Sequence, residues 1–285
     1  MSDAVLLGPA QIRALAAELD VRPTKKWGQN FVVDANTVRK IVALAGVEAG
    51  EEVVEIGPGL GSLTLGLLEA GARMTVVEID ERLATVLPRT VERMQPEAAE
   101  RLTVIAQDAM TIDALPADPV RLVANLPYNI SVPVLLHFME HFPSLVAGIV
   151  MVQAEVGHRL AADPGSKIYG APSAKAAWYG HWRVSATVSR QVFWPVPNVD
   201  SVLVSFERVG TGLGTEAERL GTFEIIDLAF QQRRKMLRQA LSSRFGGSGP
   251  AAEVLVEAGV TPTARGEELT TEDFLRIARV VAARG

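Results

Sequence analysis

One apolar run ends in chemical groups that are unusual for a strand end. The stretch LVANLPYNIS, Leu122–Ser131, places an amide, a proline and an aromatic ring after a strand-like segment. The side-chain oxygen of Asn125 and a backbone carbonyl at Leu126 or Pro127 could accept the hydrogens of an exocyclic amine and turn its lone pair toward an electrophilic carbon. Tyr128 could support a nucleobase taken out of its stack. A proline turn with a buried tyrosine is the simpler interpretation of these residues alone, so the functional one depends on their surroundings.

A glycine-rich turn follows an earlier apolar run and supplies those surroundings. In EIGPGLG the turn begins at Gly57, Glu78 closes the next predicted strand, and Asp108 ends a third. Strand ends of a parallel sheet meet at one edge, so backbone groups, a ribose acceptor and an acceptor for an adenine amino group would lie together. The dinucleotide fingerprint has its last glycine where this chain has Ser62. A cofactor without a pyrophosphate is therefore favoured, and S-adenosylmethionine fits the set.

Alternating strand and helix patterns predict the frame that holds these residues. Such alternation is typical of a mostly parallel sheet covered on both faces. Asp34 is the expected N-cap of a helix over Ala35–Ala45. The segments on either side of WPVPNVD predict a terminal antiparallel pair. Strands are expected at Val53–Ile56, Met74–Ile79, Leu102–Ala106, Arg121–Ala124 and Gly148–Val152.

The C-terminal part has a different pattern. A glycine-rich linker, Gly210–Thr215, is followed by helical spacing alone, with Thr270 and Asp273 as a predicted capping box. We therefore predict an α/β domain with its N-terminal arm over residues 1–211 and a small helical domain over residues 212–285.

Composition and charge exclude several classes of protein. The chain has 285 residues, no cysteine and a net charge of -5. The absence of thiols excludes disulfide scaffolds and thiolate zinc sites. The start of the chain lacks a basic signal-peptide region and its apolar runs are short, so we expect a cytoplasmic protein without membrane spans.

Basic residues cluster locally and predict either a solvated helix face or a phosphate-binding surface: Lys25, Lys26, Arg233, Arg234, Lys235 and Arg238.

Several motifs, in this order, closely resemble the ribosomal RNA adenine N6,N6-dimethyltransferases, and in particular their small-subunit branch. The resemblance spans roughly residues 24–241 and rests on GQNFVVD, EIGPGLGSLT, VVEID, QDAM, NLPYNIS, MVQAEVGHRL, SKIYGAPSA, VFWPVPNVDSVLV and AFQQRRKMLRQAL. It implies a Rossmann-like, S-adenosylmethionine-dependent methyltransferase. The implied substrate is a pair of adjacent adenosines in the 3′-terminal hairpin of small-subunit rRNA, methylated within a pre-30S particle by a monomer.

The resemblance also implies roles for individual residues. Asn125, Leu126, Pro127 and Tyr128 would hold the target adenine, with Phe193 closing over its other face. The loop at residues 166–173 and a helix bearing QRRK would contact RNA. Contacts to the cofactor would come from Asn30, Val32, Gly57, Glu78, Asp108 and Asn125.

Four alternatives stay open at this point. A large-subunit adenine methyltransferase of the resistance type shares the cofactor motifs and a similar tetrapeptide, and the SKIYGAPSA and QRRK runs favour the small subunit over it. A zinc peptidase is suggested by H-x-x-E-H at His137–His141, but no third ligand is evident and we expect no metal. Ser62 disfavours an NAD-dependent oxidoreductase. An assembly factor without catalysis would not need the intact cofactor and NLPY residues.

Overall fold

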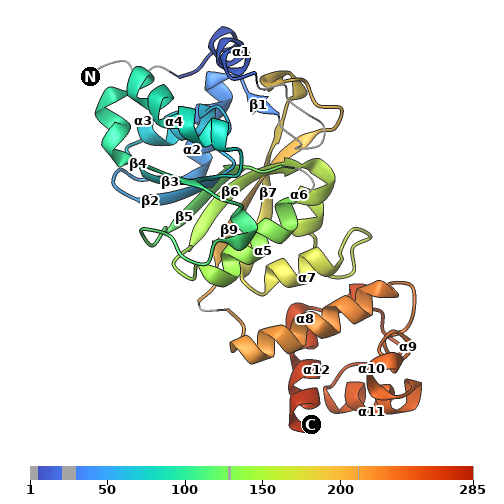
Figure 1. Ribbon diagram of the computed structural model, residues 1–285. Coiled ribbons are helices and arrows are strands. Elements are labelled where there is room, and N and C mark those ends of the chain that lie inside the picture. The colour runs from blue at the N-terminus through green and yellow to red at the C-terminus, as the bar shows by residue number, and fades with distance from the viewer. Residues whose placement is uncertain (1–5, 21–29, 128–129, 211, 285) are drawn as a thin grey trace. The chain divides into compact units, whose positions relative to one another are not determined.

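The structure, a computed structural model, describes residues 6–20, 30–127, 130–210 and 212–284 (Figure 1). The chain divides into two compact units, which we call the sheet unit (residues 1–157 and 183–207) and the helical unit (residues 158–182 and 208–285). This division differs from the predicted boundary near Gly212, because the segment 158–182 joins the helical unit. The physical reason is packing: Tyr169 and Ala174 are fully buried in the helical unit's core, and the Thr271 hydroxyl donates to the Ala174 carbonyl at 2.8 Å.

A seven-stranded sheet forms the frame of the sheet unit, in the order β4-β3-β2-β5-β6-β9-β7. All neighbours from β4 to β6 are parallel, and β9 is antiparallel to β6. The predicted strands are confirmed, with ends within one residue of those expected. The strands are β2 (Glu52–Ile56), β3 (Arg73–Glu78), β4 (Leu102–Ala106), β5 (Arg121–Asn125), β6 (Ala147–Gln153), β7 (Gly180–Val188) and β9 (Ser201–Arg208).

Helices cover both faces of this sheet, with α3 and α4 on one side and α5 on the other (Figure 1). The predicted N-cap of α2 is confirmed, because the Asp34 carboxylate accepts from the Thr37 amide at 2.7 Å. The helices and 3-10 turns of this part are α1 (Pro9–Glu18), α2 (Ala35–Ala45), α3 (Ser62–Glu69), α4 (Glu81–Met94), η2 (Pro96–Arg101), η3 (Ala109–Thr111), α5 (Ser131–His141), α6 (Ala154–Leu160) and η4 (Arg190–Val192).

A second, two-stranded sheet was not predicted. β1 (Phe31–Val32) pairs antiparallel with β8 (Phe193–Trp194), so that Val32 lies opposite Phe193. The Val33 amide extends the pairing by donating to the Val192 carbonyl at 2.8 Å. Two segments about 160 residues apart in sequence are thereby joined beside the main sheet.

The helical unit consists of helices around its own apolar core, which includes Phe274, Ile277 and Leu255. Its last helix begins with the predicted capping box, since the Thr270 amide donates to Asp273 at 2.8 Å and the Asp273 amide donates to the Thr270 hydroxyl at 3.2 Å. The elements are α7 (Ala171–Ala177), α8 (Glu216–Gln231), α9 (Leu237–Ala240), α10 (Ser242–Phe245), α11 (Ser248–Glu257), η5 (Gly266–Glu268) and α12 (Thr271–Arg284).

No helix in the described part of the chain is both long and apolar enough to span a membrane.

Candidate active site

A cavity of about 340 Å³ lies at the carboxyl ends of the central strands. The sheet order reverses between β2 and β5, and in open α/β sheets such a reversal leaves a crevice where ligands bind. Its volume is in the usual range for small-molecule sites. Eight of the predicted site residues line it and are thus brought together by the fold: Asn30, Val32, Gly57, Glu78, Asp108, Asn125, Leu126 and Pro127. Ser62, at the start of α3, lines it as well.

The glycine turn after β2 approaches its neighbours too closely for a side chain. Gly59 has a φ of +57°, and a Cβ added there would lie 2.9 Å from the Phe31 ring. Its amide donates to Glu78 at 3.1 Å, which ties the turn to the end of β3. Glycine is therefore required here both by conformation and by space.

Glu78 is a buried carboxylate held by backbone donors. One oxygen accepts from Gly59 and the other accepts from the Asp80 amide at 3.0 Å. Burial raises the pKa of Glu78, while these two amides act in the opposite direction. Each oxygen keeps a further lone pair, so the group can still accept from a ligand.

Asp108 has a different environment, exposed at the end of β4. Its Oδ1 accepts from the Met110 amide at 2.9 Å, which orients the carboxylate and begins the turn η3. His137 on α5 supports the same turn through Nε2, 2.7 Å from the Ile112 carbonyl. Since a carbonyl can only accept, Nε2 carries the hydrogen.

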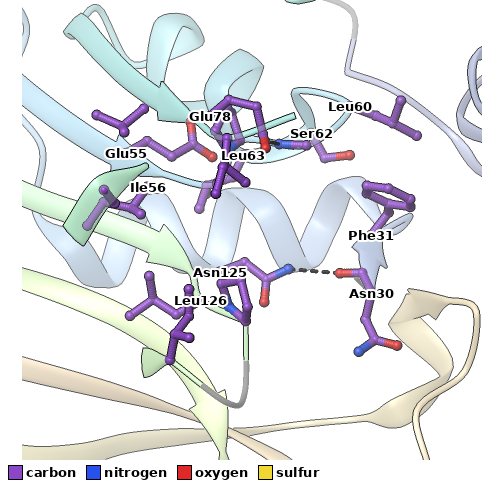
Figure 2. A pocket seen from close by; sticks show the side chains of 18 of the residues that line it. Asn30, Phe31, Glu55, Ile56, Leu60, Ser62, Leu63, Glu78, Asn125 and Leu126 are labelled. Carbon is purple, nitrogen blue, oxygen red and sulfur yellow. Dashed lines mark hydrogen bonds between the residues drawn. The ribbon is translucent and has the colours of Figure 1, made fainter. Parts of the chain in front are cut away.

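Asn125 is oriented by a backbone carbonyl from a distant part of the chain. Its Nδ2 donates to the Asn30 carbonyl at 2.9 Å, as Figure 2 shows. Because a carbonyl can only accept, this bond assigns the nitrogen and the oxygen of the Asn125 amide, and it leaves Oδ1 as the acceptor. The Pro127 carbonyl accepts from the Ile130 amide at 3.3 Å, whereas the Leu126 amide donates to Met151 at 3.1 Å.

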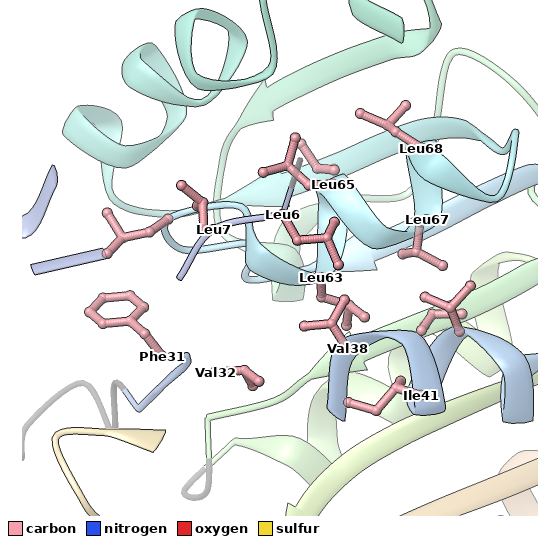
Figure 3. Packing of buried hydrophobic residues seen from close by; sticks show 14 of the residues in the cluster. Leu6, Leu7, Phe31, Val32, Val38, Ile41, Leu63, Leu65, Leu67 and Leu68 are labelled. Carbon is pink, nitrogen blue, oxygen red and sulfur yellow. The ribbon is translucent and has the colours of Figure 1, made fainter. Parts of the chain in front are cut away.

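The segment that supplies the Asn30 carbonyl is anchored in the apolar core. Phe31 and Val32 are 7% and 3% exposed and lie beside α3, with Leu63 and Val38 nearby (Figure 3). On its other side this segment is held by the antiparallel pairing of β1 with β8. Asn125 is therefore oriented by a segment that is buried and paired within the sheet unit, which suits a residue that must position a substrate.

Glu55 also lines the cavity and was not among the residues predicted from the sequence. It is 1% exposed and accepts from the Thr64 hydroxyl at 2.6 Å. Burial, with the nearby Glu78 as a smaller cause, raises the pKa of Glu55 to about 8. A single acidic residue inside the buried run VVEI is the sequence signal that could have identified it. Exposed apolar side chains at the strand ends, Ile79 and Met110, were missed as well.

Phe193 is not among the residues that line the cavity, although it was predicted to cover the adenine. Its ring is 2% exposed and belongs to the core cluster, because β8 is paired with β1. Tyr128, Lys25 and Lys26 lie outside the described residues.

The predicted QRRK helix is wrong. α8 ends at Gln231, and residues 232–235 form a turn and bend before α9. The amides of Leu237 and Arg238 donate to the carbonyls of Ala264 (2.8 Å) and Pro262 (3.2 Å) instead of continuing the helix. Of the four predicted cations, Arg234, Lys235 and Arg238 are exposed, and Arg233 forms an ion pair with Glu267 at 2.8 Å.

The histidines of the H-x-x-E-H pattern are engaged with backbone. Besides the His137 bond, His141 Nδ1 lies 2.9 Å from the His137 carbonyl, and the centroids of the two rings are 4.1 Å apart with the rings tilted by 36°. Over the described ranges, no three His, Cys, Asp or Glu side chains are grouped as a metal site.

Comparison with known proteins identifies the family. Residues 22–283 match the family model described as ribosomal RNA adenine dimethylase. A ribosomal RNA small subunit methyltransferase A from Leifsonia xyli subsp. xyli is 64% identical over 98% of this chain and 99% of its own length. The solved structures include a dimethyladenosine transferase from Plasmodium falciparum (TM-score 0.72, 23% identity, 86% of this chain and 94% of that one) and the 23S rRNA methyltransferase ErmE (TM-score 0.65, 24% identity, 89% and 100%), which share the fold. The chain belongs to the ribosomal RNA adenine dimethylase family.

Proposed function

We propose that this chain transfers methyl groups from S-adenosylmethionine to N6 of two adjacent adenosines in the 3′-terminal hairpin of small-subunit rRNA. Family membership and the 64% identical small-subunit relative favour this substrate over large-subunit rRNA. The likeness to ErmE, at 24% identity, concerns the fold alone. We further propose that the protein acts as a cytoplasmic monomer on a pre-30S particle.

The lining of the cavity fits a cationic cofactor. Its ionisable side chains among the described residues are Glu55, Glu78 and Asp108, with no lysine or arginine. Burial raises the pKa of Glu55 to about 8, so this residue is neutral at pH 7 and the negative charge comes from the other two. Such a lining attracts an ammonium or sulfonium group and repels a pyrophosphate, which argues against NAD. When bound, S-adenosylmethionine would supply an electrophilic methyl group. Glu78 and Asp108 would accept from its ribose and adenine groups.

The observation that carries the proposal is the orientation of the Asn125 amide. Because Nδ2 is bound to the Asn30 carbonyl, Oδ1 is available to accept one hydrogen of the adenine amine. We propose the Leu126 carbonyl as the second acceptor, since the Pro127 carbonyl already accepts from Ile130. Two acceptors would direct the amine's lone pair toward the methyl donor and stabilise the positive charge that develops on nitrogen.

No acid or base is needed for the methyl transfer itself. A bound sulfonium would give up its methyl group and keep the bonding electron pair as a neutral thioether, so no residue of this chain would have to supply a proton to the leaving group. The extra proton on the product nitrogen can then be lost to solvent. This accounts for a strand end built from an amide and carbonyls instead of a histidine or lysine.

The experiment that tests the proposal is incubation of the purified protein with labelled S-adenosylmethionine and unmethylated small ribosomal subunits. Nucleoside analysis after digestion should show N6,N6-dimethyladenosine in small-subunit rRNA. Unmethylated large-subunit rRNA serves as the control substrate. Label found only in large-subunit rRNA, or a monomethylated product alone, would contradict the proposal.

A further inference from the structure

Arg233 differs from its basic neighbours in the helical unit. Its Nε is 2.8 Å from Glu267 Oε2, and its Nη2 donates to the Lys167 carbonyl at 2.5 Å. Arg234 and Lys235 are exposed, and neither pairs with an acidic side chain within the described residues. A phosphate that bound Arg233 would meet the Glu267 carboxylate, which already offsets the charge of the guanidinium, whereas Arg234 and Lys235 have no such acidic neighbour within the described residues.

The backbone of Glu267 also binds the loop that contains Lys167. Its carbonyl accepts from the Gly165 amide at 2.6 Å. The residues 165–167 are thus attached to the body of the helical unit at both ends, once through Gly165 and once through the Lys167 carbonyl. The side chains that follow are exposed: Lys167 is open to solvent and Ile168 is 49% exposed.

We propose that Arg233 and Glu267 form a brace that positions Lys167 as an RNA phosphate contact, next to the contacts made by Arg234 and Lys235. This rests on the proposed rRNA substrate. Arg233 is then a positioning residue and not a phosphate ligand itself. The brace is electrically neutral, so its contribution to RNA binding comes from the geometry of the loop and not from added positive charge.

The direction in which one substitution changes RNA affinity distinguishes the brace from a simple charge effect. Glu267→Gln removes an acid near an RNA surface, and electrostatics alone predicts tighter binding. The brace predicts the opposite, a several-fold weaker binding, because a neutral amide oxygen accepts a weaker hydrogen bond from the Arg233 guanidinium than the carboxylate does and no longer pairs with its charge. Glu268→Gln is the matched control: Glu268 is the exposed neighbour in the same turn, and its loss should leave binding unchanged or slightly tighter.

A double-mutant cycle with Lys167→Gln tests the positioning directly. Binding to unmethylated small subunits is measured from 50 to 200 mM KCl at fixed Mg²⁺, where each lost phosphate contact should lower the salt slope by about 1. Arg233→Gln should lower the slope in the wild-type background and leave it unchanged in the Lys167→Gln background. Arg234→Gln should lower it in both backgrounds. Hydrogen exchange of residues 164–168 should quicken in Arg233→Gln and Glu267→Gln, but not in Arg234→Gln.

Equal losses for Arg233→Gln in both backgrounds, or tighter binding by Glu267→Gln, would overturn the brace. If Arg233→Gln does not fold, the Glu267→Gln and Glu268→Gln pair decides alone. Methylation by the wild-type protein, measured on the same particles, tests the proposed function separately, since loss of the brace leaves the cavity residues in place.

Discussion

Replacing Glu55 by glutamine should make the protein more stable at neutral and alkaline pH. The substitution keeps an acceptor for the Thr64 hydroxyl and removes only the ionisable proton. Burial raises the pKa of Glu55 from an ordinary value of 4.5 to about 8. Below pH 4.5 the carboxyl is protonated in both the folded and the unfolded chain, so it contributes no pH dependence there.

Between about pH 4.5 and pH 8 the folded protein keeps this proton and the unfolded chain loses it. Because the folded state binds more protons, the free energy of unfolding falls as the pH rises through this window. The gap between the two pKa values corresponds to roughly 5 kcal/mol once both states are ionised. Glutamine cannot ionise, so the variant does not lose this free energy as the pH rises. Its free energy of unfolding should exceed that of the wild type only slightly at pH 5 and by several kcal/mol at pH 8.

The assay is urea unfolding of both full-length proteins from pH 5 to pH 9. Glu92→Gln provides the control, because Glu92 is exposed on α4 and its loss should leave the pH profile unchanged. If wild type and Glu55→Gln have parallel profiles, Glu55 is ionised in the folded protein at neutral pH and the reasoning is wrong.

Three other substitutions test the site and its supports. Asn125→Ala should lower single-turnover methyl transfer by about 10²- to 10³-fold, the range seen when one oriented polar group is removed from an active site, and leave binding to small subunits intact; equal loss of both would argue against its role. Gly59→Ala brings a Cβ to 2.9 Å from Phe31 and should weaken S-adenosylhomocysteine binding in calorimetry at least tenfold. Gly46→Ala, at a similar φ of +63° with open space around it, should not. Asp34→Ala removes the N-cap of α2 and should lower stability by about 1 kcal/mol, seen as a lower thermal midpoint, whereas Asp34→Asn should retain most of it; an unchanged midpoint in the alanine variant would exclude the cap as a stabilising contact.

The sequence by itself determined the order of the main-sheet strands along the chain and the edge at which the site lies. Local hydrophobic patterns are enough to predict strands such as β4, and helix signals such as Asp34 act within a single turn. Strand ends of a parallel sheet converge, so the positions of Gly57, Glu78 and Asp108 along the chain already implied a common site.

Only the tertiary structure decided which groups support that site. The Asn30 carbonyl that orients Asn125 comes from 95 residues away, and the pKa of Glu55 depends on its burial. The QRRK run is helical by local pattern, yet the amides of Leu237 and Arg238 just after it donate to the carbonyls of Ala264 and Pro262, and Arg233 pairs with Glu267. Contacts between distant segments follow from packing in three dimensions, and a local pattern in one sequence does not record them.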